Sequence, residues 1–201
     1  MSGLLAASAL GTATAEAAGR SAAEPVAPEG WELVEGPELA SLAGGELNTL
    51  AADNVEGPYG LQSVKNGLFV ANEVTYRAPY TGLQRARSTG WNGSWEDLYL
   101  EWNEATESYA IFSGATGLYV AVEKNWSGSD NGLLRARSTS VGGWERFSVW
   151  FNEDSGHYAL QSLANGRFVA MENSWTGTRQ YALRARSTDI NGSWEEFDFW
   201  G

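Results

Sequence analysis

The chain of 201 residues lacks cysteine altogether and has a single histidine, His157. Without cysteine it forms no disulfide bond and no thiolate zinc site, although this count does not fix the redox compartment. With one histidine it lacks the commonest general base and most histidine-based metal sites. The sequence also has no nucleophile elbow, no phosphate-binding glycine loop and no metal-ligand spacing. We therefore expect a non-catalytic protein that holds no metal and no cofactor.

Positive charge is scarce as well, because the chain has only two lysines and a net charge of −12. The acid is concentrated in residues 1–57, which hold nine acidic residues and one arginine, whereas residues 58–201 hold sixteen acidic and twelve basic residues. A nearly balanced body lacks the broad basic field that binds phosphate backbones or anionic lipid surfaces. We therefore expect neither nucleic acid nor membrane as a partner.

The N-terminal stretch GLLAASALGTATAEAAG is too short and too weakly apolar to cross a bilayer, which takes roughly 20 apolar residues. It resembles the apolar core of a secretory signal with A-x-A cleavage sites, but no basic residue precedes it. This pattern predicts a signal-peptide remnant at 1–17 and a secreted protein, with a flexible alanine-rich terminus as the alternative. Residues 24–57 are expected to form a largely unstructured acidic linker, unless Trp31 and Leu33 pack on the body.

One pattern is repeated three times in the body of the chain, and each of its landmarks returns after 49 or 50 residues. The pentapeptide RARST recurs, and a Trp-Glu pair follows each copy of it. The copies of RARST begin at Arg85, Arg135 and Arg184, and the repeats span about 58–107, 108–156 and 157–201. Residues 58–201 are therefore expected to form one domain of three repeats of about 49 residues.

Each repeat is predicted to form four strands. The first two strands flank a turn such as Asn66-Gly67, the third contains RARST, and the fourth alternates apolar and polar residues after the Trp-Glu pair. Four strands cannot bury their own apolar face, and closing the three repeats into a ring removes the exposed sheet edges. The sequence therefore predicts an all-β fold, a pseudo-threefold β-trefoil in which the last strand pairs with Tyr59–Ser63. We expect it to be a monomer.

The arginines of RARST are expected to point outward, because side chains alternate along a strand and Leu134 and Ala136 would face the core. Their expected role is to form recurrent ion pairs with the equally repeated glutamates, since a planar guanidinium fits a carboxylate. The sequence leaves two sets of partners open, Glu96, Glu145 and Glu195 or Glu73, Glu123 and Glu172. A basic ring that binds a ligand is the alternative.

The motifs NGLFVANE, LQRARST and WEDLYL, with their counterparts in the other two copies, resemble those of the fascin-like β-trefoil family. The resemblance covers residues 58–201 and implies the trefoil fold. Eukaryotic fascins bundle actin through several trefoils and basic patches, whereas this chain has one trefoil and two lysines, so we do not expect actin binding. Fascin-like modules of secreted bacterial proteins are regarded as carbohydrate-binding. The Q-x-W signature of ricin-type lectins is absent.

One aromatic residue occupies the same place in a polar loop of each repeat, namely Tyr76, Trp126 and Trp175. An aromatic ring in a hydrophilic loop can stack on the apolar face of a sugar, and nearby polar groups can bind its hydroxyls. The candidate polar groups are Glu123, Asn125, Glu172 and Asn173. The alternative is that these rings fold inward and plug the end of the barrel.

The other tryptophans receive separate predictions. Those of the Trp-Glu pairs, Trp95, Trp144 and Trp194, are expected in or near the core. Trp150 and Trp200 alternate away from the core and are expected at the surface. Trp91 has no counterpart in the other repeats and is a candidate local addition to a site.

Taken with the resemblance, these patterns favour a secreted, carbohydrate-binding, lectin-like module whose partner is a polysaccharide or other glycan. A protein-interaction module of fascin-like type without glycan binding is the second hypothesis. An enzyme, or a fold with no ligand of its own, is the third.

Overall fold

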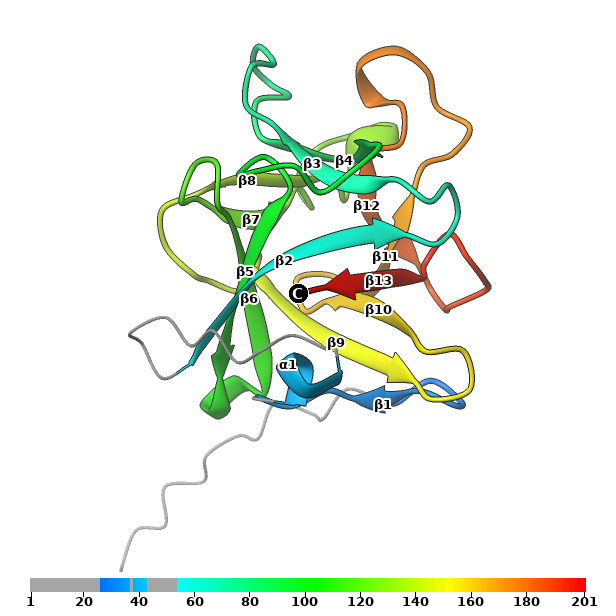
Figure 1. Cartoon of the computed structure of the whole chain (residues 1–201). Coiled ribbons are helices and arrows are strands. Elements are labelled where there is room, and N and C mark those ends of the chain that lie inside the picture. Colours follow the sequence, from blue (N-terminus) through cyan, green and yellow to red (C-terminus); the bar gives the residue numbers. More distant parts are fainter. Residues whose placement is uncertain (1–25, 37, 43–53) are drawn as a thin grey trace, which may run out of the picture.

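We describe the protein from a computed structural model, which defines residues 26–36, 38–42 and 54–201 (Figure 1). The strands and the one α-helix follow in this order: β1 (Glu32–Leu33), α1 (Glu38–Leu42), β2 (Val55–Ser63), β3 (Phe69–Glu73), β4 (Leu83–Ser88), β5 (Asp97–Asn103), β6 (Ser108–Ser113), β7 (Tyr119–Val122), β8 (Leu134–Ser138), β9 (Arg146–Asn152), β10 (His157–Ser162), β11 (Arg167–Met171), β12 (Leu183–Ser187) and β13 (Phe197–Trp200). Single 3₁₀ turns lie at Glu104–Thr106, Gly128–Asp130 and Gly177–Arg179. None of the helices in the described part of the chain has the length and apolarity to cross a membrane.

Six strands form a closed barrel. Each of β2, β5, β6, β9, β10 and β13 pairs antiparallel with two others of the set, and the ring runs β2–β5–β6–β9–β10–β13 and back to β2. The closing pair places Trp200 opposite Gly60 and Phe197 opposite Ser63, so the predicted contact between the last strand and Tyr59–Ser63 is confirmed. Closure leaves no long open edge at this seam.

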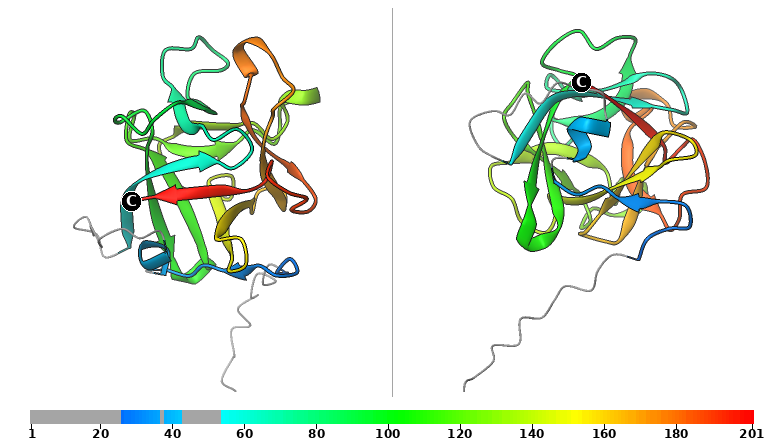
Figure 2. Two further views of the ribbon diagram at one scale, coloured as in Figure 1. Left: turned by 45° about the vertical axis from the view of Figure 1, so that its right-hand side comes forward. Right: turned by 60° about the horizontal axis from the view of Figure 1, so that its bottom comes forward.

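The remaining body strands form three hairpins, β3–β4, β7–β8 and β11–β12, which gather at one end of the barrel (Figure 1). Each hairpin lies in sequence between two consecutive barrel strands, and Figure 2 shows the arrangement from two further sides. A six-stranded barrel capped by a hairpin triplet is the β-trefoil, so the all-β prediction is confirmed. We call the capped side the hairpin end.

The core is built from the inward half of each alternating strand. The predicted pairs Leu98 and Leu100, Phe147 and Val149, and Phe197 and Phe199 are all buried. In the RARST strands, Leu134, Ala136, Leu183 and Ala185 also face this core, as expected from the alternation. In the first repeat the buried position holds Gln84 instead of leucine.

The Asn-Gly turns connect the first and second strands of a repeat. Gly67 has a φ of +67°, which glycine adopts without steric cost. The Asn66 side chain accepts a hydrogen bond from the Leu68 N–H and donates one to the Ala86 carbonyl. Asn165 makes the same two contacts in the third repeat, so the predicted turns also tie the barrel to the hairpins.

Part of the predicted linker is ordered, which corrects the expectation of a largely unstructured segment. β1 pairs with β9, and Trp31, Val34 and Leu39 are buried. Tyr109 donates a hydrogen bond to the Gly36 carbonyl, and α1 lies across the barrel mouth opposite the hairpin end (Figure 2). The segment therefore completes the core from below. The predicted signal-peptide remnant at 1–17 and the rest of the predicted linker up to residue 53 lie outside the described residues.

The predictions for the tryptophans need two corrections. Trp95 and Trp194 are 46% and 41% exposed, because the fourth strands begin only after the Trp-Glu pairs and these rings sit in turns. Trp144, in the Trp-Glu pair of the second repeat, is partly exposed and also lies outside the core. Trp150 does alternate away from the barrel core, yet it is 1% exposed, because it packs with Trp31, Ala159 and Phe168 in a separate cluster. Trp200 is 50% exposed, as predicted.

Candidate functional site

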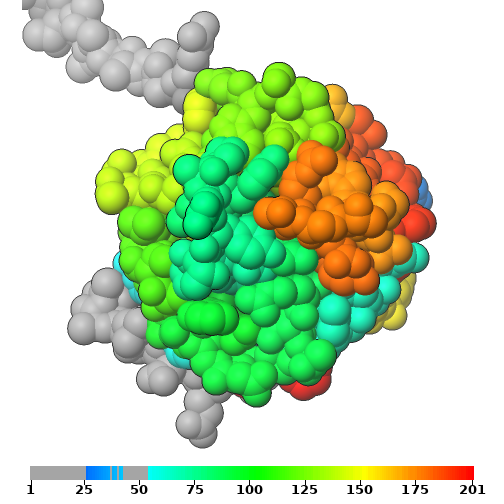
Figure 3. All heavy atoms as spheres, turned by 90° about the horizontal axis from the view of Figure 1, so that it is seen from above, coloured from blue at the N-terminus to red at the C-terminus, as the bar shows by residue number. Residues whose placement is uncertain are grey.

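The three predicted loop aromatics meet at the hairpin end. Tyr76, Trp126 and Trp175 each lie in the loop between the two strands of a hairpin and are half-buried. Their inner sides pack against Leu83, Leu133 and Ala182, which are fully buried. Figure 3 looks onto this end and shows the three loops gathered around its centre. The small aliphatic residues thus close the barrel, and the aromatic rings form a partly exposed layer above them.

A glutamate beneath each ring binds two arginines. Glu123 accepts hydrogen bonds from Arg135 Nη1 at 2.9 Å and from Arg137 Nε at 2.6 Å, and Glu123 is buried. Glu73 binds Arg85 and Arg87 in the same way, and Glu172 binds Arg184 and Arg186. Of the two sets of partners that the sequence left open, the structure selects Glu73, Glu123 and Glu172.

The other repeated glutamates have a different role. Glu145 accepts a hydrogen bond from the Gly142 N–H at 2.8 Å, and Glu195 accepts one from Ser187 Oγ at 2.5 Å. The first bond stays within the loop that precedes the fourth strand of its repeat, and the second ties that loop to Ser187, the last residue of β12. These glutamates therefore brace their own loops and do not pair with the arginines of RARST.

The first arginine of each RARST also joins neighbouring hairpins. Arg135 Nε donates to the Thr81 carbonyl at 2.9 Å, and Arg184 Nε donates to the Asn131 carbonyl at 2.6 Å. Arg85 Nε closes the cycle by donating to the Gln180 carbonyl at 2.6 Å. Each guanidinium thus connects its own glutamate with the loop of the next hairpin, which fixes the three loops relative to one another.

The same guanidinium groups lie over aromatic rings. Arg135 Cζ is 5.2 Å from the ring centroid of Trp126, and Arg137 Cζ is 5.6 Å from that of Trp144. Arg85 lies over Tyr76, while Trp175 has both Arg179 and Arg184 nearby. A cation held this close to an aromatic ring is attracted to it, so the rings are oriented by the ion-pair network.

Three different residues occupy one equivalent position at the loop tips, namely Tyr80, Asp130 and Arg179. Tyr80 donates a hydrogen bond to Asp130 at 2.8 Å, and Arg179 donates to the other oxygen of the same carboxylate. The hydrogen bond to Asp130 is the main cause that raises the pKa of Tyr80 above its usual range. Because the three residues differ, they complement one another and lock the loop tips together. The sequence signal for this contact is the placement of a phenol, a carboxylate and a guanidinium at equivalent positions of the three repeats.

A pocket of about 480 Å³ opens between the first and third loops. Its lining includes Tyr76, Pro79 and Tyr80 from one loop, and Gly177 and Thr178 from the other. These two loops lie next to each other in the teal and orange regions of Figure 3. Of the predicted site residues, only Tyr76 lines this pocket.

The predicted polar groups fall into two classes. Asn125 and Asn173 are exposed beside Trp126 and Trp175, where they are free to face a ligand. Glu123 and Glu172 are buried and have their carboxylates bound by arginines. In the described residues, no cluster of His, Cys, Asp or Glu has the geometry to hold a metal ion. The geometry therefore offers three partly exposed rings on a rigid scaffold, two of them with an exposed amide neighbour.

Comparisons with known proteins agree with this fold. No protein-family model matches the chain, and no curated protein matches it. Among solved structures, a mosquitocidal holotoxin aligns with a TM-score of 0.59 at 16% identity, over 77% of this chain but only 18% of its own length. ThreeFoil, a designed 3-fold symmetric protein, gives 0.57 at 18% identity over 73% of this chain and 99% of its own. The Rhizoctonia solani agglutinin aligns with a TM-score of 0.54 at 15% identity, over 77% of this chain and 99% of its own length.

At these identities the likeness concerns the fold alone. The resemblance of the repeat motifs to the fascin-like family stays a prediction. Together with the closed barrel and its hairpin triplet, the comparisons establish that the chain has the β-trefoil fold.

Proposed function

We propose that this protein is a non-catalytic, lectin-like module that binds a glycan through the aromatic rings of its hairpin loops. The observation that carries the proposal is the rigid presentation of Tyr76, Trp126 and Trp175, each partly exposed and each held by an arginine. Similarity in fold to the Rhizoctonia solani agglutinin supports it. Secretion and a monomeric state belong to the same proposal.

The physical basis is that sugars bind well to rings that are already in place. A sugar ring offers a flat C–H face to an indole and hydroxyl groups to its polar neighbours. Because the Arg–Glu network and the Tyr80–Asp130 bond fix the loops before any ligand arrives, little conformational entropy is lost on binding. Trp126 with Asn125 and Trp175 with Asn173 form two such pairs, and Tyr76 with the adjoining pocket forms the third.

The absence of catalysis is part of the proposal. Glycoside hydrolysis needs two carboxylates facing a scissile bond. The glutamates nearest the loop rings, Glu73, Glu123 and Glu172, are each buried under two arginines. We assign them a positioning role in which they hold the arginines that orient the rings.

Pull-down with insoluble polysaccharides tests this function. We expect wild-type protein to bind at least one of cellulose, xylan, chitin and curdlan, and we expect Trp126→Ala and Trp175→Ala each to weaken that binding about tenfold, the usual loss when a central aromatic is truncated. Trp194→Ala is the matched control, because Trp194 is exposed in a different loop and should leave binding unchanged. Near-UV circular dichroism confirms that each variant is folded. Undiminished binding by both loop variants would rule out these stacking sites.

The protein-interaction alternative predicts no binding to any glycan. Even if the protein-interaction alternative is correct, we do not expect actin to be the partner. The two lysines, Lys65 and Lys124, each lie over a tryptophan ring and form no basic patch of the kind that fascins use. Actin co-sedimentation is the measurement. A pellet containing the protein in stoichiometric amount would favour the fascin-like alternative.

A further inference from the structure

The outer wall of the barrel has three pseudo-equivalent positions, one where the last strand of each repeat meets the first strand of the next. Each position has a small residue as its floor: Ala110, Ala159 or Gly60. Opposite these floors, at the paired Cα positions, stand Glu101, Trp150 and Trp200. The three positions share one architecture, so their differences can be compared directly.

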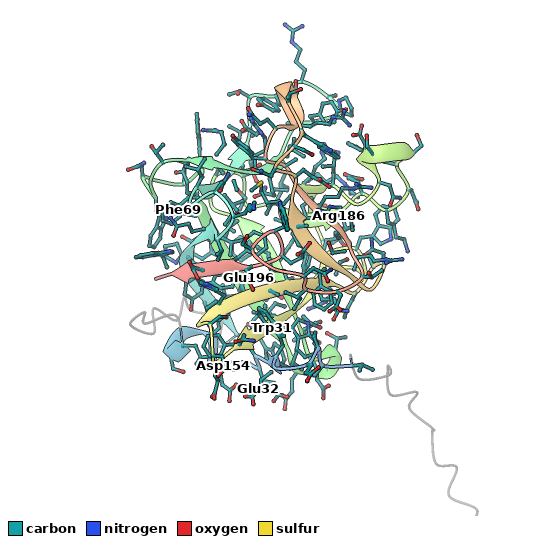
Figure 4. The ribbon with its side chains drawn as sticks, turned by 90° about the vertical axis from the view of Figure 1, so that its right-hand side faces the viewer. Trp31, Glu32, Phe69, Asp154, Arg186 and Glu196 are labelled. Atoms are coloured by element: carbon teal, nitrogen blue, oxygen red, sulfur yellow. The ribbon has the colours of Figure 1, made fainter. Side chains whose placement is uncertain are left out.

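At two of the three positions, the residue opposite the small one has its side chain held by other residues of the chain. At the first, Glu101 accepts a hydrogen bond from the Tyr119 hydroxyl at 2.6 Å. At the second, Trp150 packs with Phe168 and with Trp31 of the N-terminal segment, and only 1% of Trp150 is exposed. Figure 4 labels Trp31 near the lower end of the barrel. An aromatic ring therefore covers the second position.

The third position has the equivalent tryptophan, Trp200, and within the part of the chain that the structure describes no N-terminal ring packs on it as Trp31 packs on Trp150. Trp200 donates a hydrogen bond from Nε1 to Gln62 at 3.1 Å, as Trp150 does to Gln161 at 3.1 Å, so the two indoles are held alike. Trp200 is nevertheless 50% exposed. Phe69, labelled in Figure 4, meets it edge-on with ring centroids 6.2 Å apart.

A third ring extends this surface. A Cβ atom added to Gly60 would lie 3.0 Å from Trp91 and 3.1 Å from Phe69, so both rings converge on the glycine floor. Trp91 occupies the position that Ile190 has in the third repeat. It is the tryptophan without a counterpart in the other repeats, which the sequence marked as a candidate addition to a site. Trp91, Phe69 and Trp200 form an aromatic strip, which we call the wall site.

The polar groups around the wall site differ from those at the covered position. Asp97 accepts a hydrogen bond from Trp91 Nε1 at 2.7 Å, and Asp198 contacts His157 Nδ1 at 2.7 Å. Both carboxylates are partly exposed and keep a second oxygen for other donors. The residue equivalent to Asp198 at the covered position is the buried Ser148. The segment that carries Trp31 is acidic, and a similar peptide bound at the wall site would place its glutamates near Asp97 and Asp198. Repulsion between like charges disfavours such a ligand.

We propose that the wall site binds a sugar ring of a neutral glycan, as a second site separate from the hairpin loops. Trp200 supplies the flat apolar face, as Trp150 does for Trp31, and Asp97 and Asp198 accept hydrogen bonds from the hydroxyl groups of the sugar. The inference rests on the proposed function in taking a glycan as the ligand. Its own claim is the location and the neutral, hydroxyl-rich chemistry.

Nuclear magnetic resonance of the indole N–H groups tests the proposal on the full chain. Each tryptophan gives one Nε1–H signal, and Trp200→Phe identifies that of Trp200 by its disappearance. The probes are the hexaoses of β-1,4-glucan, β-1,3-glucan, β-1,4-xylan and α-1,4-glucan. We expect one of them to shift the Trp200 signal in a saturable way, in Trp126→Ala and Trp175→Ala protein as well as in wild type. The Trp91 signal should shift with it, and Trp200→Ala should abolish this shift of the Trp91 signal, whereas Trp194→Ala should preserve it.

The outcomes separate this inference from the proposed function. A hexaose that shifts loop signals but leaves the Trp200 signal unmoved overturns the wall site and leaves the glycan-binding function standing. No shift of any indole signal with all four hexaoses overturns the wall site, and if wild-type protein also binds none of the insoluble polysaccharides, the proposed function is overturned as well. A synthetic peptide of residues 28–36 is the remaining arm: if it shifts the Trp200 signal and no hexaose does, the wall site binds a protein segment and the sugar assignment is wrong.

Discussion

At the scale of single residues, the repeated arginines are explained by the number of contacts that one guanidinium makes. Arg135 binds Glu123, donates to the Thr81 carbonyl of the neighbouring loop and lies over Trp126. Lysine has neither the planar fork nor the several fixed donors for this combination. The repeat therefore keeps arginine in an acidic chain for a structural reason, and the surrounding burial makes these ion pairs stronger than pairs in open solvent.

Removing the shared glutamate should be costly. Glu123→Ala leaves Arg135 and Arg137 without their carboxylate in a part-buried site, and we expect it to lower the free energy of unfolding by about 3 kcal/mol. Urea denaturation followed by tryptophan fluorescence measures this. Glu153→Ala is the control, because Glu153 is exposed and its removal should change stability by less than about 0.5 kcal/mol. Equal midpoints for the two variants would refute the role of the network.

A second prediction concerns alkaline pH. The hydrogen bond to Glu101, with burial, raises the pKa of Tyr119 from 10 to about 12. Because the pKa of Tyr119 is higher in the folded than in the unfolded state, its hydrogen bond contributes fully to the free energy of unfolding below pH 10. This contribution is lost as the pH rises toward 12. Between these values, wild type should lose up to about 1.4 kcal/mol more of its unfolding free energy per pH unit than Tyr119→Phe. Parallel slopes of stability against pH for the two proteins would contradict this.

At the scale of elements, the repeat pattern predicted the hairpins, the barrel strands and their inward residues, but not what lies over them. The prediction for Trp95, Trp144 and Trp194 assumed that the fourth strand of each repeat already includes them. In the structure they lie in the turns before β5, β9 and β13, where the strand alternation has not begun, so these rings lie outside the core. Burial of Trp150 depends on Trp31, which is about 120 residues away in sequence and belongs to no repeat. Periodicity reports local geometry and therefore cannot reveal a contact made by a segment from outside the pattern.

The same limit applies to the candidate site. The position of Tyr76, Trp126 and Trp175 in the hairpin loops followed from their equal spacing. The sequence did not decide whether Glu123 and Glu172 pair with the arginines of RARST, because each repeat has two glutamates close enough in sequence to be the partner. Only the strand register, which sets Arg135 opposite Ala121 and close to Glu123, decides between them.

The N-terminal segment should contribute strongly to stability through α1. Leu39 is fully buried in the main core, and Leu39→Ala should cost about 3 kcal/mol of unfolding free energy because it leaves a cavity. Leu42, in the same helix, is 42% exposed and provides the control, with an expected change under about 0.5 kcal/mol. Urea midpoints of the two variants are the measurement. A Leu39→Ala protein as stable as Leu42→Ala would mean that the helix does not complete the core.

At the scale of the whole molecule, the three hairpins are joined by a cycle of backbone hydrogen bonds. Ala136 N–H donates to the Gly82 carbonyl and Ala185 N–H to the Gly132 carbonyl, both at 2.8 Å, and Ala86 N–H donates to the Tyr181 carbonyl at 3.0 Å. Each bond crosses between repeats, so no hairpin keeps its contacts when another is displaced. This interlocking is the reason that we expect the loop rings to act as one rigid surface.

The cycle gives a prediction at this scale. Gly132 has a φ of +89°, and a Cβ atom there would lie 2.6 Å from the Ala185 carbonyl oxygen, so Gly132→Ala forces two repeats apart. Gly128 in the same loop also has a positive φ but has nothing within 4 Å, so Gly128→Ala carries only the conformational cost of about 1 kcal/mol. We expect Gly132→Ala to lose at least about 2 kcal/mol more than Gly128→Ala in thermal or urea unfolding. Equal losses would show that the repeats are not closely locked at this point.

A glycan array probed with wild-type protein and with the combined variant Trp126→Ala, Trp175→Ala and Trp200→Ala tests the central claim most directly. We expect selective binding of the wild type to neutral glycans of at least one linkage class, and loss of that binding in a variant that remains folded. Folded wild-type protein that binds no glycan on the array would contradict it.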